Sequence, residues 1–243
     1  PYRISANIGR VMDNLVRTFK GKIYFHLIPS YYGERKVYKG VPFVGKVPDD
    51  CDLYVIFKPK EEKIQAVREV LAKGKAAILI AAKFGEVEEG AELERKLKDV
   101  IEQANEEGCL VGPNTMGVVT PDYDATFAEK KAGIKASRES NIALISQSGV
   151  FLSAGASSLA LRNTKIHYGI SIGNAMDLGA ADYLEYILEY EPQIKVVAMY
   201  LEDAGGERGG GAARADPRHL RQPHHDVHGR RRLHRLRRLL GLP

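Results

Sequence analysis

Four short loops combine glycine with hydroxyl, amide or charged side chains, and each directly follows an apolar run. They occupy residues 83–86, 112–117, 146–149 and 171–174. Glycine lets the backbone approach a ligand closely, and a serine that opens a helix leaves amide groups available to an anion. A single serine–glycine pair at a helix start is equally an ordinary N-cap. Several such loops at one edge of a sheet therefore predict a site for an anionic ligand.

Elements that could position these loops alternate along the first 205 residues. Apolar runs typical of strands alternate with segments of helical periodicity, the first of which begins after Asn7 as a possible cap. The expected strands are residues 22–28, 53–57, 76–81, 110–111, 142–145, 166–172 and 194–201, with helices over 8–19, 64–71 and 93–104 and from about 150 and 180. This order predicts an α/β fold with parallel sheets covered by helices on both faces. The loops that follow the strands then lie at the sheet edge where ligands bind in such folds.

Two α/β units fit the chain. A polar stretch interrupts the alternation, so we expect a first domain over 1–125, a linker over 126–140 and a second, truncated domain over 141–205. The first helix follows Pro1 almost directly, whereas a doubly wound domain normally opens with a strand and a glycine-rich turn. We therefore expect that strand to be missing; the alternative is a sheet that begins with Ile23.

The net charge of +5 comes from one end of the chain. Residues 206–243 hold ten Arg and no Lys, against one Glu and two Asp. Such a tail could be a basic arm for nucleic acid, a disordered segment, or the product of a shifted reading frame. We favour the last two interpretations, so nucleic acid is not an expected partner.

Composition excludes several classes of protein. The longest apolar run, residues 76–82, is too short to span a bilayer, and no signal peptide opens the chain. Two cysteines do not make a disulfide framework, so we expect a cytoplasmic protein.

Taken together, the loop motifs resemble one family. The motifs are Gly-Pro-Asn-Thr-Met-Gly at 112–117, Ala-Leu-Ile-Ser-Gln-Ser-Gly at 143–149, Ser-Ile-Gly-Asn at 171–174 with Asp177, and Tyr-Leu-Glu at 200–202. In this order they are similar to the α-subunit of nucleoside-diphosphate-forming (NDP-forming) acyl-CoA synthetases, which include ADP-forming acetyl-CoA synthetases and, more distantly, succinyl-CoA synthetase. The resemblance covers residues 5–205 and does not extend into the tail.

The resemblance implies a Rossmann-like domain that binds coenzyme A, followed by a flavodoxin-like domain. It implies the reversible reaction of a small carboxylic acid, coenzyme A and ATP to acyl-CoA, ADP and phosphate through a phosphohistidine. ATP or ADP with Mg would bind an ATP-grasp partner, which is a separate β-subunit or a fused domain, so a hetero-oligomer is expected.

The resemblance also implies roles for particular residues. The coenzyme A loops correspond to Lys58, Pro59, Ala82, Lys83, Phe84, Glu86, Gly112, Pro113, Asn114, Thr115 and Met116. Ser148 and Gly149 match the helix start that receives the phosphoryl group, and Glu202 matches the carboxylate that orients the catalytic histidine. Lysine and backbone amides suit phosphates, and apolar Phe84 and Met116 suit adenine or pantetheine.

The catalytic histidine has no identifiable counterpart. Five histidines lie in the tail without the expected neighbours: His219, His224, His225, His228 and His234. His26 and His167 fall in predicted strands and are expected to be structural. As written, the chain is therefore expected to be inactive in the phosphoryl relay.

Two other functions remain open. One is a coenzyme A-binding module without ligase activity, such as the sensor half of a protein acetyltransferase. The other is an NAD enzyme. It is less favoured, because no complete Gly-x-Gly-x-x-Gly motif follows a strand.

Overall fold

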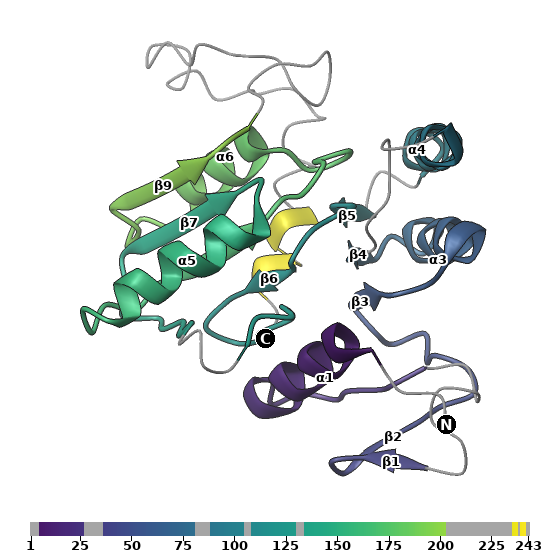
Figure 1. The fold of residues 1–243 in the computed structure, drawn as a ribbon, viewed down its shortest axis with the longest axis horizontal. Coiled ribbons are helices and arrows are strands. Elements are labelled where there is room, and N and C mark those ends of the chain that lie inside the picture. The colour runs from purple at the N-terminus through teal and green to yellow at the C-terminus, as the bar shows by residue number, and fades with distance from the viewer. Residues whose placement is uncertain are drawn as a thin grey trace.

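The computed structural model describes residues 5–26, 36–80, 88–104, 108–129, 134–202, 235–237 and 239–241. These residues form two main sheets flanked by helices, with a small hairpin beside the first sheet (Figure 1). The α/β fold class predicted from the sequence is confirmed. No helix among the described residues is long and apolar enough to cross a bilayer.

The first sheet has three parallel strands. Its order is β3 (Leu53–Ile56), β4 (Ala76–Leu79) and β5 (Cys109–Val111). Alternate residues of β4 face opposite layers, as strand geometry requires. Ala77 and Leu79 pack with α3 (Lys60–Ala72) and α4 (Glu88–Glu102), whereas Ala76 and Ile78 belong to the core that contains Val11 of α1 (Ala6–Thr18).

The segment before the first sheet is less regular than predicted. Of the expected strand over 22–28, the described part contributes only a parallel bridge between Phe25 and Phe43. Phe43 follows a short hairpin of β1 (Val37–Tyr38) and β2 (Val41–Pro42), which the sequence did not predict. The helix cap also differs, because Ser5 rather than Asn7 accepts a hydrogen bond from the Ile8 amide at 3.3 Å.

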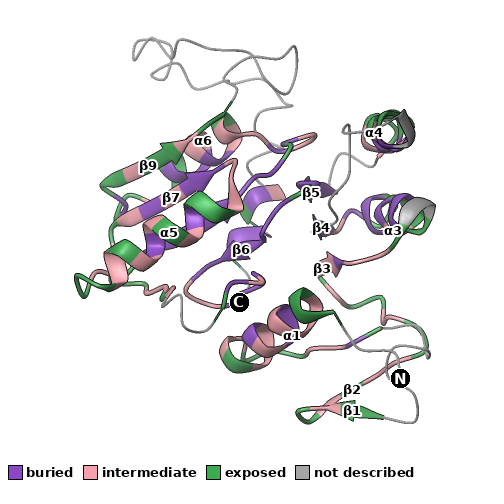
Figure 2. Ribbon diagram, in the orientation of Figure 1, coloured by how far each residue is buried: buried purple, intermediate pink, exposed green. Residues whose placement is uncertain are grey.

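The second sheet has the order β6-β8-β7-β9. Its strands are β6 (Val118–Val119), β8 (Tyr168–Ser171), β7 (Ile142–Ser146) and β9 (Val196–Tyr200), and only β6 runs antiparallel to its neighbour. Leu144 of β7 packs toward α5 (Gly149–Ala160), whereas Ile145 packs with residues of α6 (Ala180–Tyr190), so the two helices cover opposite faces. In Figure 2, β6 is buried and β9 carries exposed residues. Because β6 precedes the predicted linker, the second sheet takes one strand from within residues 1–125.

The end of the basic tail is packed rather than disordered. Residues 235–237 and 239–240 are helical, and Leu236, Leu239 and Leu240 are at most 1% exposed in the main core. The Tyr123 hydroxyl donates a hydrogen bond of 2.6 Å to the Leu239 carbonyl oxygen. The expectation of disorder is therefore wrong for these residues. Residues 203–234 lie outside the described part, and the shifted reading frame stays a prediction.

Candidate functional site

The carboxyl ends of the three parallel strands place two of the predicted coenzyme A loops at one sheet edge. Lys58 and Pro59 follow β3, and residues 112–116 follow β5. A Cβ on Gly112 would lie 2.8 Å from the carbonyl oxygen of Leu79 at the end of β4, so the second loop passes directly against that strand. Ala82, Lys83, Phe84 and Glu86, predicted for the same edge, lie outside the described residues.

Side chains of this edge differ in their accessibility. Within residues 112–116 only Asn114 is exposed, and it adopts a left-handed backbone conformation with φ of 58°. Met116, for which the sequence suggested contact with adenine or pantetheine, is 5% exposed and packs with Leu152 and Ala128. Lys58 keeps 33% of its side chain exposed and forms an ion pair of 3.7 Å with Glu62. Among the described residues of this edge, the polar side chains available to a ligand are thus Lys58 and Asn114.

The loop at 112–117 is bonded to a loop of the second sheet. The Thr115 hydroxyl donates to the backbone oxygen of Ser171, and the Ser171 hydroxyl accepts a hydrogen bond of 3.0 Å from the Met116 amide. The amide of Asn174 donates to the carbonyl oxygen of Pro113 at 2.8 Å. Two motifs that are about 56 residues apart in the chain are therefore one structural unit.

Glycine at position 173 is required by this contact. Gly173 has a φ of +58°, and a Cβ there would lie 2.2 Å from the carbonyl oxygen of Pro113. Residues other than glycine avoid this backbone conformation, and no side-chain rearrangement relieves an overlap with backbone. The glycine of this motif therefore serves the approach of two loops to each other.

Asp177 is a structural anchor of the same unit. Its carboxylate accepts a hydrogen bond of 2.7 Å from the Leu110 amide and forms an ion pair of 2.6 Å with Arg235. Burial raises the pKa of Asp177 above its ordinary value, although Arg235 and the Leu110 amide both act in the opposite direction. The carboxylate therefore joins β5 to the C-terminal helical segment.

The start of α5 meets the same loop from the other side. The Ser148 side chain caps the helix by accepting a hydrogen bond of 3.3 Å from the Phe151 amide. A Cβ on Gly149 would lie 2.7 Å from Cβ of Met116, so the first turn of α5 packs directly on residues 112–117. The amides of a first helical turn lack partners within the helix and carry the positive end of its dipole.

Glu202 lies beside this helix start. Its amide donates a hydrogen bond of 2.9 Å to Oε1 of Gln147, and the Gln147 amide donates one of 2.9 Å to the carbonyl oxygen of Tyr200. The Tyr200 ring also stacks on Phe151, with ring centroids 4.0 Å apart. Gln147 thus bonds the end of β9 to the start of α5. Its only signal in the sequence is its place inside the Ser-Gln-Ser-Gly motif.

Comparisons with known proteins agree with this arrangement. Residues 139–214 match the family model described as succinyl-CoA ligase like flavodoxin domain. The ADP-forming acetate–CoA ligase of Methanocaldococcus jannaschii is 35% identical over 212 residues, which cover 85% of this chain and 28% of that protein. The α-subunit of the ADP-forming acetate–CoA ligase II of Pyrococcus furiosus is 34% identical over 79% of this chain and 40% of that subunit.

A solved structure agrees as well. The dinucleotide-forming acetyl-coenzyme A synthetase 1 of Ca. Korarchaeum cryptofilum, in complex with phosphate and ADP, superposes with a TM-score of 0.69 at 28% identity. The alignment covers 84% of this chain and 42% of that structure. In sequence and fold, this chain is therefore similar to the α-type region of NDP-forming acyl-CoA synthetases. It spans between about a quarter and a half of the length of these relatives, in their α-type region.

Of the two described histidines, His167 offers no candidate for the phosphoryl relay. His167 is 4% exposed, its ring packs edge-on against Tyr168, and Nδ1 lies 3.1 Å from the Ser140 carbonyl oxygen. His167 is therefore structural, as predicted. His26 follows Phe25, which forms the bridge to Phe43, and it lines the cavity beside the first sheet. The five tail histidines lie outside the described residues.

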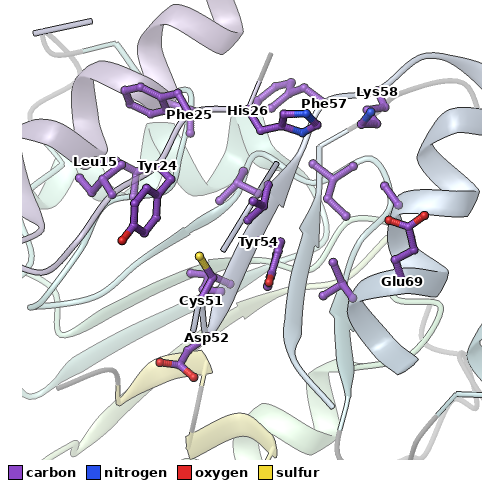
Figure 3. A pocket seen from close by; sticks show the side chains of 18 of the residues that line it. Leu15, Tyr24, Phe25, His26, Cys51, Asp52, Tyr54, Phe57, Lys58 and Glu69 are labelled. Carbon is purple, nitrogen blue, oxygen red and sulfur yellow. The ribbon is translucent and has the colours of Figure 1, made fainter. Parts of the chain in front are cut away.

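A cavity of about 720 Å³ adjoins the first sheet (Figure 3). It is lined by α1, residues 22–26, β3 and α3, and Lys58 lies at one end. Most of the lining side chains are apolar, including Leu15, Phe25 and Phe57. Among the described residues no group of three His, Cys, Asp or Glu could hold a metal ion.

Proposed function

We propose that this chain is the coenzyme A-binding and phosphoryl-receiving α-part of an NDP-forming acyl-CoA synthetase. The reaction is the reversible conversion of a small carboxylic acid, coenzyme A and ATP to acyl-CoA, ADP and phosphate through a phosphohistidine. The observation that carries this proposal is the close packing of Gly149 on Met116. It supports a single site in which the start of α5 adjoins the loop assigned to coenzyme A.

Coenzyme A is assigned to the carboxyl edge of the first sheet. The cationic Lys58 and the exposed amide Asn114 suit its phosphates, since a charged donor and an amide donor both bind phosphate oxygens. The rigid backbone of residues 112–117 fixes where these groups stand, because it is bonded to Ser171 and Asn174. When bound, coenzyme A supplies the thiol that accepts the acyl group.

The phosphoryl group is assigned to the start of α5. The helix dipole and the first amides, beginning at Gly149, stabilise negative charge there without a full counter-charge. Ser148 caps this turn, and Gln147 holds the Glu202 backbone beside it. A carboxylate in this position is suited to orient a phosphohistidine.

The remaining parts of the reaction are assigned to a partner. ATP or ADP with Mg binds an ATP-grasp β-subunit or fused domain, so the working enzyme is a hetero-oligomer or a longer polypeptide. We place it in the cytoplasm, which suits the two free thiols of Cys51 and Cys109.

Calorimetric titration with coenzyme A tests the first assignment. Lys58→Gln should weaken binding about tenfold or more, because it removes a charged donor to phosphate. Lys98→Gln is the matched control, since Lys98 also forms an i,i+4 ion pair, with Glu94, but lies on α4 away from the edge. Equal affinities for coenzyme A in the two variants, or no binding by the wild-type chain, would contradict the assignment.

A coenzyme A-binding module without ligase activity is the second candidate. It is favoured by the burial of His167 and by the lack of an assignable relay histidine among the described residues. Incubation with acetyl-CoA and radiolabelled phosphate distinguishes a working ligase from the sensor module. A ligase that carries the relay histidine releases acetate and coenzyme A and becomes labelled on histidine, in an acid-labile and base-stable form. A sensor module, like a ligase chain without that histidine, acquires no label.

A further inference from the structure

The C-terminal helical segment is attached to the rest of the molecule through side chains. It comprises residues 235–237 and 239–241, the yellow ribbon in Figure 1. Asp177, Cys109 and Tyr123 form its polar contacts, by the ion pair with Arg235 and by bonds to carbonyl oxygens of the segment. Within the described part of the chain, no backbone-to-backbone hydrogen bond joins the segment to either sheet. The segment can therefore leave without breaking a strand ladder or a helix.

The leucines of the segment lie on one helical face. Leu236, Leu239 and Leu240 recur at the spacing i, i+3, i+4 and are at most 1% exposed, whereas Arg237 is exposed. All three leucines belong to the core cluster that contains residues of β5 and α6. A Cβ on Gly241 would lie 3.9 Å from the Tyr186 hydroxyl of α6. The segment thus closes the core with one apolar face.

Two buried polar groups at this contact have no partner. They are the Tyr183 hydroxyl and Nε of Arg235. Burial raises the pKa of Tyr183, and Cys109, Asp177 and Tyr123 act in the same direction, so this hydroxyl lies among the residues that hold the segment. Buried polar groups are nearly always hydrogen-bonded in native proteins. Water would hydrate both groups if the segment left, so attachment carries a desolvation cost that detachment removes.

Asp177 connects the segment to the loop at 112–117. Residues 174–178 run beside residues 110–113, with amide-to-carbonyl bonds from Leu178 to Leu110, from Met176 to Gly112 and from Asn174 to Pro113. The Asp177 carboxylate adds a bond of 2.7 Å from the Leu110 amide, and Arg235 holds the same carboxylate at 2.6 Å. Leu110 stands two residues before Gly112, where the loop begins. Arg235 therefore fixes the acceptor that holds the start of this loop.

We propose that residues 235–237 and 239–241 form a latch, which engages and releases as a unit and thereby controls the loop at 112–117. When the latch is engaged, Arg235 holds the Asp177 carboxylate on the Leu110 amide and the leucines close the core. When it is released, Nε of Arg235 and the Tyr183 hydroxyl are hydrated, an apolar groove opens beside β5 and α6, and the Leu110 amide loses its acceptor. This proposal does not depend on the proposed enzymatic function.

Amide hydrogen exchange of the full chain, followed by NMR, tests the latch through two neighbouring residues of β5. The Leu110 amide donates to the Asp177 carboxylate, whereas the Cys109 amide donates to the Lys75 carbonyl oxygen at 3.2 Å, beside β4. Release of the latch speeds the exchange of Leu110 alone, and unfolding of the first sheet speeds both. The readout is therefore the ratio of the Leu110 rate to the Cys109 rate.

Substitutions at two arginines of the segment give the main comparison. Arg235→Gln removes the cation from a buried pair and should raise the ratio about 100-fold. Arg237→Gln is the matched control, because it makes the same change on the exposed face of the same segment and should leave the ratio unchanged. Arg235→Lys keeps the cation without the planar fork and should return the ratio to within about tenfold of the wild-type value.

Two tyrosines give changes of opposite sign. Tyr123→Phe removes the donor to the Leu239 carbonyl oxygen and should raise the ratio about fivefold, an effect that reaches Leu110 only through the segment. Tyr183→Phe removes a buried hydroxyl that has no partner, so it should favour the engaged latch and lower the ratio about fivefold.

The proposal is overturned if Arg235→Gln speeds both amides by the same factor, because the segment then leaves only when the first sheet unfolds. Equal ratios in Arg235→Gln and Arg237→Gln would also overturn it. If Arg235→Gln does not fold, the tyrosine variants decide the matter, and equal ratios in Tyr123→Phe and Tyr183→Phe overturn the proposal.

Discussion

Replacing Gly173 by alanine should strongly destabilise the protein, because two independent costs fall on one added methyl group. The left-handed backbone at φ of +58° costs a residue with a Cβ about 1–2 kcal/mol. The same Cβ would stand 2.2 Å from the carbonyl oxygen of Pro113, and relieving such an overlap in a packed region costs about 1–3 kcal/mol. The expected loss in the free energy of unfolding is therefore about 2–5 kcal/mol, a large share of the stability of an ordinary domain.

Urea denaturation followed by circular dichroism measures this loss, and Gly155→Ala is the matched control. Gly155 lies inside α5 without a positive φ, and its nearest neighbour would be Cδ1 of Leu144 at 3.8 Å, an ordinary contact. There the same added methyl group should stabilise the protein by about 0.5–1 kcal/mol through helix propensity. The reasoning is refuted if Gly173→Ala unfolds within about 0.5 kcal/mol of the wild-type chain. If the loops at 112–117 and 171–174 act as one unit, Gly173→Ala should also weaken the coenzyme A binding that we propose for residues 112–116.

Three further substitutions or reactions test the same structure. Arg235→Met should lower the free energy of unfolding by about 3–5 kcal/mol in urea denaturation, because it leaves the buried carboxylate of Asp177 without its cation. The loss should be smaller at acidic pH, because burial raises the pKa of that carboxyl and a protonated carboxyl needs no cation. A loss independent of pH would contradict this. Asn14→Ala should lower the free energy of unfolding by about 2–4 kcal/mol, because the buried side-chain amide donates to two backbone carbonyl oxygens at 2.9 and 3.1 Å. A loss below about 1 kcal/mol would argue against those hydrogen bonds. With a disulfide reagent, Cys51 should react more slowly than a free thiol, since burial raises its pKa. Cys109, which is 1% exposed, should react only after the protein unfolds. A faster reaction of Cys109 than of Cys51 would refute the burial of Cys109.

Most of the regular elements could be predicted because their signal is local. The apolar run at 76–81 and the helical spacing over 64–71 correspond to β4 and α3, whose buried faces follow from the period of each element. β6 has only two residues and runs antiparallel to β8, so it offered no periodicity to detect. The cap at Ser5 was missed because Asn7, two residues later, is an equally good capping type.

The glycine-rich loops show what local signals leave open. The sequence indicated that the backbone at Gly173 must approach something closely, and a ligand was the expected neighbour. In the structure the neighbour is the backbone of Pro113, about 60 residues earlier in the chain. Asp177, which follows the same motif, likewise contacts protein, because its carboxylate bonds to the Leu110 amide and Arg235. Residue types state which contacts are possible, and the tertiary fold decides between protein and ligand as the partner.

The sequence by itself determined the α/β class, the alternation of strands and helices, and the resemblance to the synthetase family, because each depends on periodicity or on short ordered motifs. Only the tertiary structure decided that residues 112–117, 146–149 and 171–177 form one bonded unit, that the end of the Arg-rich tail is buried, and that β3 is an edge strand among the described residues. Those facts depend on pairings between residues far apart in the chain, such as Thr115 with Ser171 and Asp177 with Arg235. Such pairs leave no periodic trace in a single sequence, because they are selected by the packing of whole layers rather than by their neighbours along the chain.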